Sequence, residues 1–282
     1  MADKVRMPAV AGTFYPSEDS NLLRTIQECF RHELGPGKLP PATDLPMPRA
    51  LVSPHAGYSY SGPIAAHGFY SVSSLESIDL AIILGPNHWG IGSGIASVDG
   101  GLWRTPFGDV EVDSESVKEL VRSTGIVDVD ERAHSKEHSI EVQIPFLQHI
   151  FSNKFKILPI SMYLQDILTA QDIAKGLVPI LNKKRTLLIA SSDLTHYERL
   201  SIATRKDLQL VKAIESLDLE KFYEVLESLN VTACGYGPIG VLISIMKQIG
   251  ISKGRLLKYA TSGHTTRDFS SVVGYASIVF ET

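Results

Sequence analysis

Hydrophobic and polar positions change period along the chain, and these changes predict strands and helices in alternation. Short apolar runs that are typical of buried strands occupy residues 50–52, 80–84, 156–161 and 187–190. Apolar residues recur at helical spacing over residues 64–70, 114–123, 139–150, 166–181, 204–216, 218–229 and 238–249. An earlier helix carries Leu22, Ile26 and Phe30 on one side and ends near Leu34. Buried strands that alternate with helices indicate a layered α/β fold.

The last part of the chain changes this picture from a parallel sheet to a mixed one. Residues 255–261 and 272–280 are predicted to form two strands that pair with each other, which argues against a wholly parallel sheet. Residues 95–98 and 101–104 are predicted to form a hairpin around Asp99-Gly100. Pro145 is expected to bend its helix or delay its start. We expect a three-layer α/β/α fold with a mixed central sheet, in a single domain over residues 1–282.

Composition excludes several classes of protein. The chain has 282 residues, of which 44% are hydrophobic, and its net charge of −4 comes from 27 basic and 31 acidic residues. This balance gives no electrostatic footprint for nucleic acid or for an anionic membrane. No apolar run approaches the roughly 20 residues of a membrane helix, and the start of the chain has no signal-peptide core. Two cysteines make no disulfide framework, so we expect a protein of the reducing cytoplasm.

Polar side chains that could bind a metal or transfer protons follow the predicted apolar strands. His55 comes after the run at 50–52 and is flanked by small residues and glycine, and His88 comes after the run at 80–84. Asp193 and His196 come after the run at 187–190. Ligand crevices of open α/β sheets lie beyond the carboxyl ends of the strands. We therefore expect these side chains to meet at one edge of the sheet.

Two of these histidines suggest a metal site. Neutral imidazoles such as those of His55 and His88 bind zinc, copper and ferrous iron. We choose Cys234 as the third ligand, because it precedes a predicted helix start, where the pKa of a thiol is lowered and the thiolate is favoured. The alternative interpretation is that Cys234 is a small buried residue, as Cys29 is in its helical pattern.

Asp193 and His196 suggest proton transfer. If the segment turns helically, the two side chains lie on one face, and Asp193 orients His196 as a proton donor or acceptor. The alternative is that Asp193 and the preceding serines cap a turn. Residues 133–143 hold two histidines and two glutamates, of which His138 and Glu141 are expected to face the crevice beside the metal and His134 to be exposed.

Three more residues are candidates for substrate contacts. Asn87 offers hydrogen bonds beside His88, and Tyr58 and Tyr197 offer apolar walls with a hydroxyl group. We expect the crevice to take a small molecule or a peptide, and we expect no nucleic acid and no membrane as partners. The pattern leaves the oligomeric state open.

Several segments together resemble the Memo family. They are Pro8-Ala-Val-Ala-Gly-Thr-Phe-Tyr-Pro16, Pro54-His-Ala-Gly-Tyr58, Leu84-Gly-Pro-Asn-His88, Glu137-His-Ser-Ile-Glu141, Ser191-Ser-Asp193 with His196, Cys234-Gly-Tyr-Gly-Pro-Ile239 and Ser270-Ser-Val-Val-Gly-Tyr275. The resemblance implies a fold like that of the class III extradiol dioxygenases, which cleave aromatic diols with non-haem ferrous iron. It also implies a metal site of His55, His88 and Cys234. Asp193 and His196 match the motif that lines the same pocket, and His196 resembles the acid–base residue of the dioxygenases.

One difference from the dioxygenases affects the predicted chemistry. Their iron site has a carboxylate where this chain has Cys234, and a thiolate favours copper or zinc and is itself oxidisable. The resemblance thus predicts a metal-dependent oxidoreductase that uses non-haem iron or copper, with zinc as a further option. Two alternatives stay open: a metal-free hydrolase or transferase in which Cys234 attacks and His196 is the base, and a binding protein with a vestigial pocket.

Overall fold

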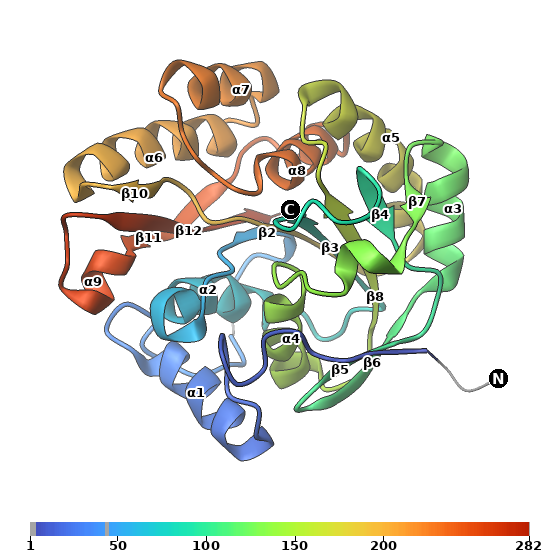
Figure 1. The fold of residues 1–282 in the computed structure, drawn as a ribbon, viewed down its shortest axis with the longest axis horizontal. Coiled ribbons are helices and arrows are strands. Elements are labelled where there is room, and N and C mark those ends of the chain that lie inside the picture. The colour runs from blue at the N-terminus through green and yellow to red at the C-terminus, as the bar shows by residue number, and fades with distance from the viewer. Residues whose placement is uncertain (1–3, 43–44, 282) are drawn as a thin grey trace.

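A mixed sheet lies between two layers of helices in the computed structural model, which describes residues 4–42 and 45–281 (Figure 1). This arrangement confirms the predicted three-layer α/β/α fold. In the described residues the sheet has 12 strands, and the strands nearest its middle are buried along their whole length. Such burial explains why their sequences are continuous apolar runs.

The elements follow one another in the predicted alternation. The strands are β1 (Val5–Arg6), β2 (Pro48–Ser53), β3 (Leu80–Pro86), β4 (Ile95–Ser97), β5 (Leu102–Thr105), β6 (Gly108–Val112), β7 (Asp128–Val129), β8 (Lys156–Met162), β9 (Thr186–Ser191), β10 (His196–Glu198), β11 (Arg255–Thr261) and β12 (Val272–Glu281). The α-helices are α1 (Asp19–Arg31), α2 (Tyr58–Val72), α3 (Ser114–Thr124), α4 (Ile144–Phe151), α5 (Ile167–Lys183), α6 (Leu200–Glu215), α7 (Leu219–Ser228), α8 (Tyr236–Gln248) and α9 (Ser262–Thr266). Two short 3₁₀ helices, η1 (Glu131–His134) and η2 (Glu141–Gln143), flank an irregular segment.

The order of strands sets where the loops meet. The path through the sheet is β1-β5-β6-β8-β3-β9-β2-β12-β10. Strands β8, β3, β9 and β2 are neighbours and run parallel, whereas β12 is antiparallel to β2 and also pairs with β11. The closing pair of strands was predicted correctly. Because β2, β9 and β3 are parallel neighbours, the loops that follow them emerge at the same edge.

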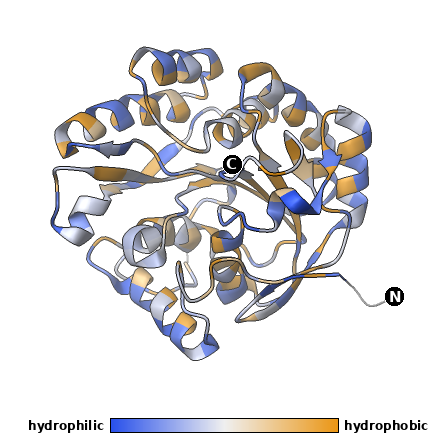
Figure 2. Cartoon of the chain, viewed as in Figure 1, coloured by the Kyte–Doolittle hydropathy of each residue, from blue (hydrophilic) through white to orange (hydrophobic). Residues whose placement is uncertain are grey.

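Helices cover both faces of the sheet. Helices α1, α2 and α4 lie on one face, and α3, α5, α6 and α8 lie on the other, with α7 packed on α6 and α8 (Figure 1). Helix α1 buries Leu22, Ile26 and Phe30 and shows hydrophilic residues outward (Figure 2). Across the described ranges, no helix combines the length and the apolar character that crossing a membrane requires.

Two local predictions are corrected. Strand β4 does not form a hairpin with β5; it pairs with β8 and β7, and the hairpin is β5–β6. Gly100 and Gly101 both have positive φ, near 83° and 89°, and this conformation carries the chain away from β4 instead of back along it. The helix predicted over 139–150 starts late, at Ile144, because Pro145 is accommodated only in its first turn.

Candidate metal centre

The carboxyl edge of the sheet brings the predicted side chains together. His55 follows β2, His88 follows β3, and Asp193 follows β9, which lies between β2 and β3. The imidazole rings of His55 and His88 have centroids 5.2 Å apart. Parallel strands that end side by side account for this convergence.

A third imidazole, that of His138, completes a cluster with His55 and His88. One ring nitrogen from each of the three lies within 4.8 Å of the other two. The rings of His88 and His138 stack at 4.7 Å, and that of His55 stands almost perpendicular to both. Nitrogen ligands of a tetrahedral zinc ion lie about 3.4 Å apart, given Zn–N bonds of about 2.0–2.1 Å. The cluster thus fits a metal ion after a small inward movement.

Ser191 fixes which nitrogen of His55 is free. The Ser191 hydroxyl donates to the carbonyl of Ser139 at 2.7 Å, so its oxygen can only accept from other groups. Gln143 donates one N–H to that oxygen, and the His55 Nδ1 lies 2.9 Å from it. Nδ1 must therefore carry the proton, which leaves the lone pair of Nε2 directed at the cluster.

Glu137 likewise holds the proton of His88 on Nδ1 and leaves Nε2 free to face the cluster. One carboxylate oxygen accepts from His88 Nδ1 at 2.9 Å and the other accepts from the His88 backbone N–H at 2.7 Å. Burial alone raises the pKa of a carboxyl group, but these bonds and the nearby imidazoles outweigh it and lower the pKa of Glu137 to about 2. A carboxylate that holds the far nitrogen of a histidine is a regular feature of metal-ligating histidines.

Burial favours the uncharged form of two imidazoles of the cluster, those of His55 and His138. Burial, with the neighbouring imidazoles, lowers the pKa of His55 well below its usual value, and burial lowers the pKa of His138 to about 4. Both rings are therefore unprotonated near neutral pH and available to a cation. Burial raises the pKa of Asp193 to about 6, against the effect of backbone N–H groups from His55 and Ala56 that stabilise its carboxylate.

Cys234 lies beside the cluster, outside its group of three. Its Sγ is 3.0 Å from Nε2 of His55 and accepts the backbone N–H of Asp193 at 3.3 Å. The expected lowering of its pKa is wrong for the metal-free protein: burial and the charge of Asp193 raise the pKa of the thiol well above its usual value. Gly235 does cap helix α8, but the desolvation of the half-buried thiol outweighs the effect of the helix start. A bound cation would reverse this balance and favour the thiolate.

Asp193 and His196 do not form the predicted pair. The chain is extended there, and the Asp193 carboxylate accepts the backbone N–H of His55 at 2.8 Å. The Nδ1 of His196 donates to the carbonyl of Thr232 at 2.9 Å, so its Nε2 keeps a free lone pair. His196 is half-buried at the rim of the site and close enough to interact electrostatically with both His55 and Asp193.

The remaining residues that the sequence suggested for the site lie outside the imidazole cluster. Tyr58 is buried in the core and donates to the carbonyl of Val142, and Tyr197 is 78% exposed beside His196. Asn87 shapes the loop that carries His88, because its side chain accepts from two backbone N–H groups of that loop and donates to a carbonyl. Glu141 is directed away from the crevice, toward the N-terminal residues. His134, expected to be exposed, is buried with Nε2 bonded to the carbonyl of Ala96.

Sequence reasoning missed Glu137, Ser191 and Gln143 as supports of the cluster. A carboxylate directly before a candidate ligand histidine was the available signal for Glu137. Nothing in the local pattern marked Ser191 or Gln143, whose role depends on the packing of three segments.

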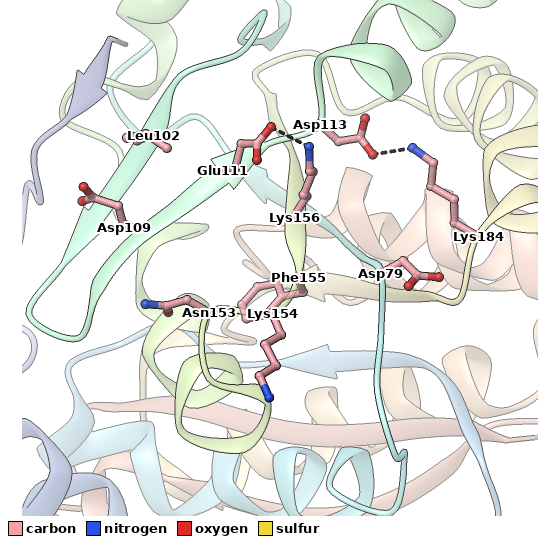
Figure 3. A pocket seen from close by; sticks show the side chains of 10 residues that line it. All are labelled: Asp79, Leu102, Asp109, Glu111, Asp113, Asn153, Lys154, Phe155, Lys156 and Lys184. Atoms are coloured by element: carbon pink, nitrogen blue, oxygen red, sulfur yellow. Dashed lines mark hydrogen bonds and ion pairs between the residues drawn. The ribbon is translucent and has the colours of Figure 1, made fainter. Parts of the chain in front are cut away.

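A separate groove at the other edge of the sheet has no cluster of metal-binding side chains among its described lining residues. This groove of about 640 Å³ opens at the amino ends of β3, β8 and β9 (Figure 3). Four of its charged side chains form ion pairs with each other, Glu111 with Lys156 and Asp113 with Lys184. The imidazole cluster at the opposite edge of the sheet is the better candidate site, because its ring nitrogens converge.

Comparison with known proteins places these residues in context. The chain matches the model of the family described as Memo-like protein over residues 6–279. It is 47% identical to a MEMO1 family protein of Methanopyrus kandleri, with 98% of each chain covered. It is 48% identical to a MEMO1 family protein of Methanocaldococcus jannaschii, with 99% of this chain and 100% of the relative covered. Its fold resembles that of the uncharacterized protein JW3007 from Escherichia coli K12, with a TM-score of 0.55 and 15% identity over 83% of this chain and 99% of that chain.

Proposed function

The chain belongs to the Memo-like protein family, and from that premise we propose that it is a metal-dependent oxidoreductase of dioxygenase-like type. The observation that carries the proposal is the cluster of His55, His88 and His138, whose ring nitrogens lie within 4.8 Å of one another. Two of these imidazoles are locked in the tautomer that a metal ion needs, by Ser191 and Glu137. Imidazole ligands suit iron, copper and zinc.

Different side chains would bind the metal and transfer the proton. His55 and His88 would hold the ion, with His138 or the Cys234 thiolate as the third ligand. Bound iron or copper would supply one-electron redox chemistry and polarise a coordinated oxygen. The Nε2 of His196 is free to take or give a proton at the rim, because Nδ1 donates to Thr232. Asp193 keeps the loop of His55 in place through its backbone N–H.

Metal content and redox activity test this proposal. We expect protein purified without oxygen and loaded with ferrous iron, copper or zinc to bind one equivalent by mass spectrometry, and His55→Ala/His88→Ala protein to bind none. Dioxygen uptake with a panel of diols and with small reductants should need iron or copper and be lost in His196→Ala protein. Equal metal in wild type and the double variant would refute the site. Metal binding without any uptake would favour a binding protein with a vestigial pocket.

A metal-free cysteine mechanism is the second candidate, and one contact favours it. The Sγ of Cys234 lies 3.0 Å from Nε2 of His55, and this contact supports His55, in place of the expected His196, as the base in such a mechanism. The raised pKa of the thiol and its burial oppose it. Rapid iodoacetamide labelling of Cys234 that persists with chelator and disappears in His55→Ala protein would support this mechanism; slow labelling in metal-free wild type would exclude it.

We propose further that the protein is cytoplasmic, forms one domain over residues 1–282 and accepts a small molecule or a peptide at the site. One large hydrophobic core that joins strands and helices from both ends of the chain supports the single domain. The exposed ring of Tyr197 beside His196 supports an approach of the ligand from that side.

A further inference from the structure

The N-terminal arm, defined as residues 5–15, lies against the segment that carries Glu137 and His138. This ligand segment, defined as residues 134–141, runs from the end of η1 to the start of η2. The arm and the ligand segment are about 130 positions apart in sequence, yet one side chain joins them at three points. The Arg6 guanidinium donates to the carbonyl of His134 at 2.8 Å, to the carbonyl of Glu137 at 2.7 Å and to the carboxylate of Glu141 at 2.7 Å.

These contacts fix a part of the chain that has little structure of its own. Between η1 and η2 the ligand segment forms neither strand nor α-helix, so its carbonyl groups need partners from outside. Arg6 supplies the partners for His134 and Glu137. Its guanidinium is planar and holds its N–H groups at fixed angles, so three simultaneous bonds define the position of the segment. The arm therefore determines where Glu137 meets His88 and where His138 meets the other imidazoles.

Four further contacts come from the arm, three to Glu141 and one to His138. Glu141, fully buried, accepts the backbone N–H groups of Ala9 and Val10 and the hydroxyl of Tyr15, in addition to Arg6. The ring of Phe14 packs against the imidazole of His138 with centroids 4.6 Å apart. The arm thus touches a candidate ligand directly and anchors the far end of the same segment.

We propose that the N-terminal arm is a component of the metal centre, with Arg6 as a positioning residue for Glu137 and His138 and with Phe14 as a wall against the His138 ring. The proposal rests on the proposed function, since it assumes that the imidazoles bind a metal ion. It goes beyond the ligands themselves, because it makes metal affinity depend on a residue that touches neither the ion nor a ligand side chain.

The Arg6→Lys variant tests the geometry of the guanidinium separately from its positive charge. A lysine keeps the positive charge beside the buried Glu141, but one ammonium group cannot replace the planar fork at both carbonyl groups. Arg104→Lys is the matched control, because Arg104 binds Asp109 through two N–H groups in an exposed pair that involves neither the ligand segment nor the imidazoles. Phe14→Leu is a second variant that leaves every contact of Arg6 in place.

Zinc affinity by chelator competition and the visible spectrum of the Co²⁺ form are the readouts. We expect Arg6→Lys to bind zinc 10–100-fold more weakly, the loss typical of groups that orient metal ligands, and to alter the Co²⁺ spectrum. Phe14→Leu should also change that spectrum, and Arg104→Lys should match wild type. In metal-free protein, amide hydrogen exchange over residues 135–142 should be faster in Arg6→Lys.

The outcomes separate the two proposals. If wild type binds neither zinc nor Co²⁺, the proposed function fails and the role of the arm fails with it. If wild type binds both and Arg6→Lys equals it in affinity, spectrum and exchange, the role of the arm is refuted and the proposed function stands. If Arg6→Lys does not fold, Phe14→Leu decides: a wild-type affinity and spectrum in that variant would overturn the role of the arm.

Discussion

Replacing Glu137 with Gln removes one charge from the cluster without changing its shape. The carboxylate accepts four hydrogen bonds: two from His88, through its backbone N–H and Nδ1, and one each from the backbone N–H groups of His138 and Ser139. Three of them converge on one oxygen, and an amide oxygen can take that place. The amide nitrogen must then face the backbone N–H of His88, where a donor meets a donor.

The magnitudes follow from these contacts. A buried donor without a partner costs about 1–3 kcal/mol, and a hydrogen bond to a charged group contributes about 1.5–3 kcal/mol. We expect the free energy of unfolding of the metal-free protein to fall by about 2–4 kcal/mol. The neutral amide oxygen is also a weaker acceptor for the His88 Nδ1–H than the carboxylate and holds the ring less firmly, so zinc affinity should fall 10–100-fold, or about 1.4–2.7 kcal/mol of binding free energy.

Urea unfolding without metal and chelator competition with zinc measure the two quantities. Glu111→Gln is the control, because Glu111 forms an exposed ion pair with Lys156 at the opposite edge of the sheet. Exposed pairs contribute about 0–1 kcal/mol, so stability should change little and zinc affinity not at all. A folded Glu137→Gln protein that binds zinc as tightly as wild type would refute the idea that Glu137 orients His88.

Three other results are expected. His138→Ala should lower zinc affinity more than Cys234→Ser in the same competition titration, because His138 belongs to the group of three nitrogens; the reverse order would assign the thiolate as third ligand. Burial lowers the pKa of His134 to about 4, so the unfolded chain binds this proton more readily, and the free energy of unfolding should fall by up to about 3 kcal/mol between pH 6.5 and pH 4. Urea titrations of His134→Gln should lack that part of the fall, and an identical pH profile would contradict the assignment. Gly85→Ala should lower the thermal midpoint and zinc affinity together, since its Cβ would lie 2.3 Å from the Ser139 hydroxyl and displace the ligand segment; an unchanged affinity would show that this contact does not position His138.

The fold could be predicted from the sequence because its central strands are buried on both faces. Continuous apolar runs at β3, β8 and β9 leave few other interpretations, and helical spacing marks the helices between them. The predicted hairpin of β4 and β5 failed because pairing depends on backbone conformation at Gly100 and Gly101, which the pattern of side chains does not report. Strand β4 finds its partner in β8, more than 60 residues away.

Some residues of the candidate site could likewise be predicted from the sequence, and others could not. His55, His88 and Asp193 could be predicted to converge because each follows a parallel strand, and parallel strands end at one edge. His138 belongs to no strand, and its position depends on long-range contacts such as the close approach of Ser139 to Gly85. Glu141 was placed at the crevice by its spacing from His138, but the 3₁₀ turn and the buried contact with Arg6 direct it to the arm.

The pKa of Cys234 shows how the metal would choose between sulfur and nitrogen. The neutral imidazoles of His55 and His138 accept a cation without releasing a proton, whereas Cys234 must first lose a proton from a thiol whose pKa burial has raised. The sulfur ligand is therefore favoured only for an ion that gains enough from a soft thiolate to offset that loss, as copper does and a hard cation does not. Because the thiol already lies 3.0 Å from Nε2 of His55, the exchange needs little movement of the chain. His138 and Cys234 would thus be alternative third ligands beside the shared pair of His55 and His88, one offering nitrogen and the other sulfur.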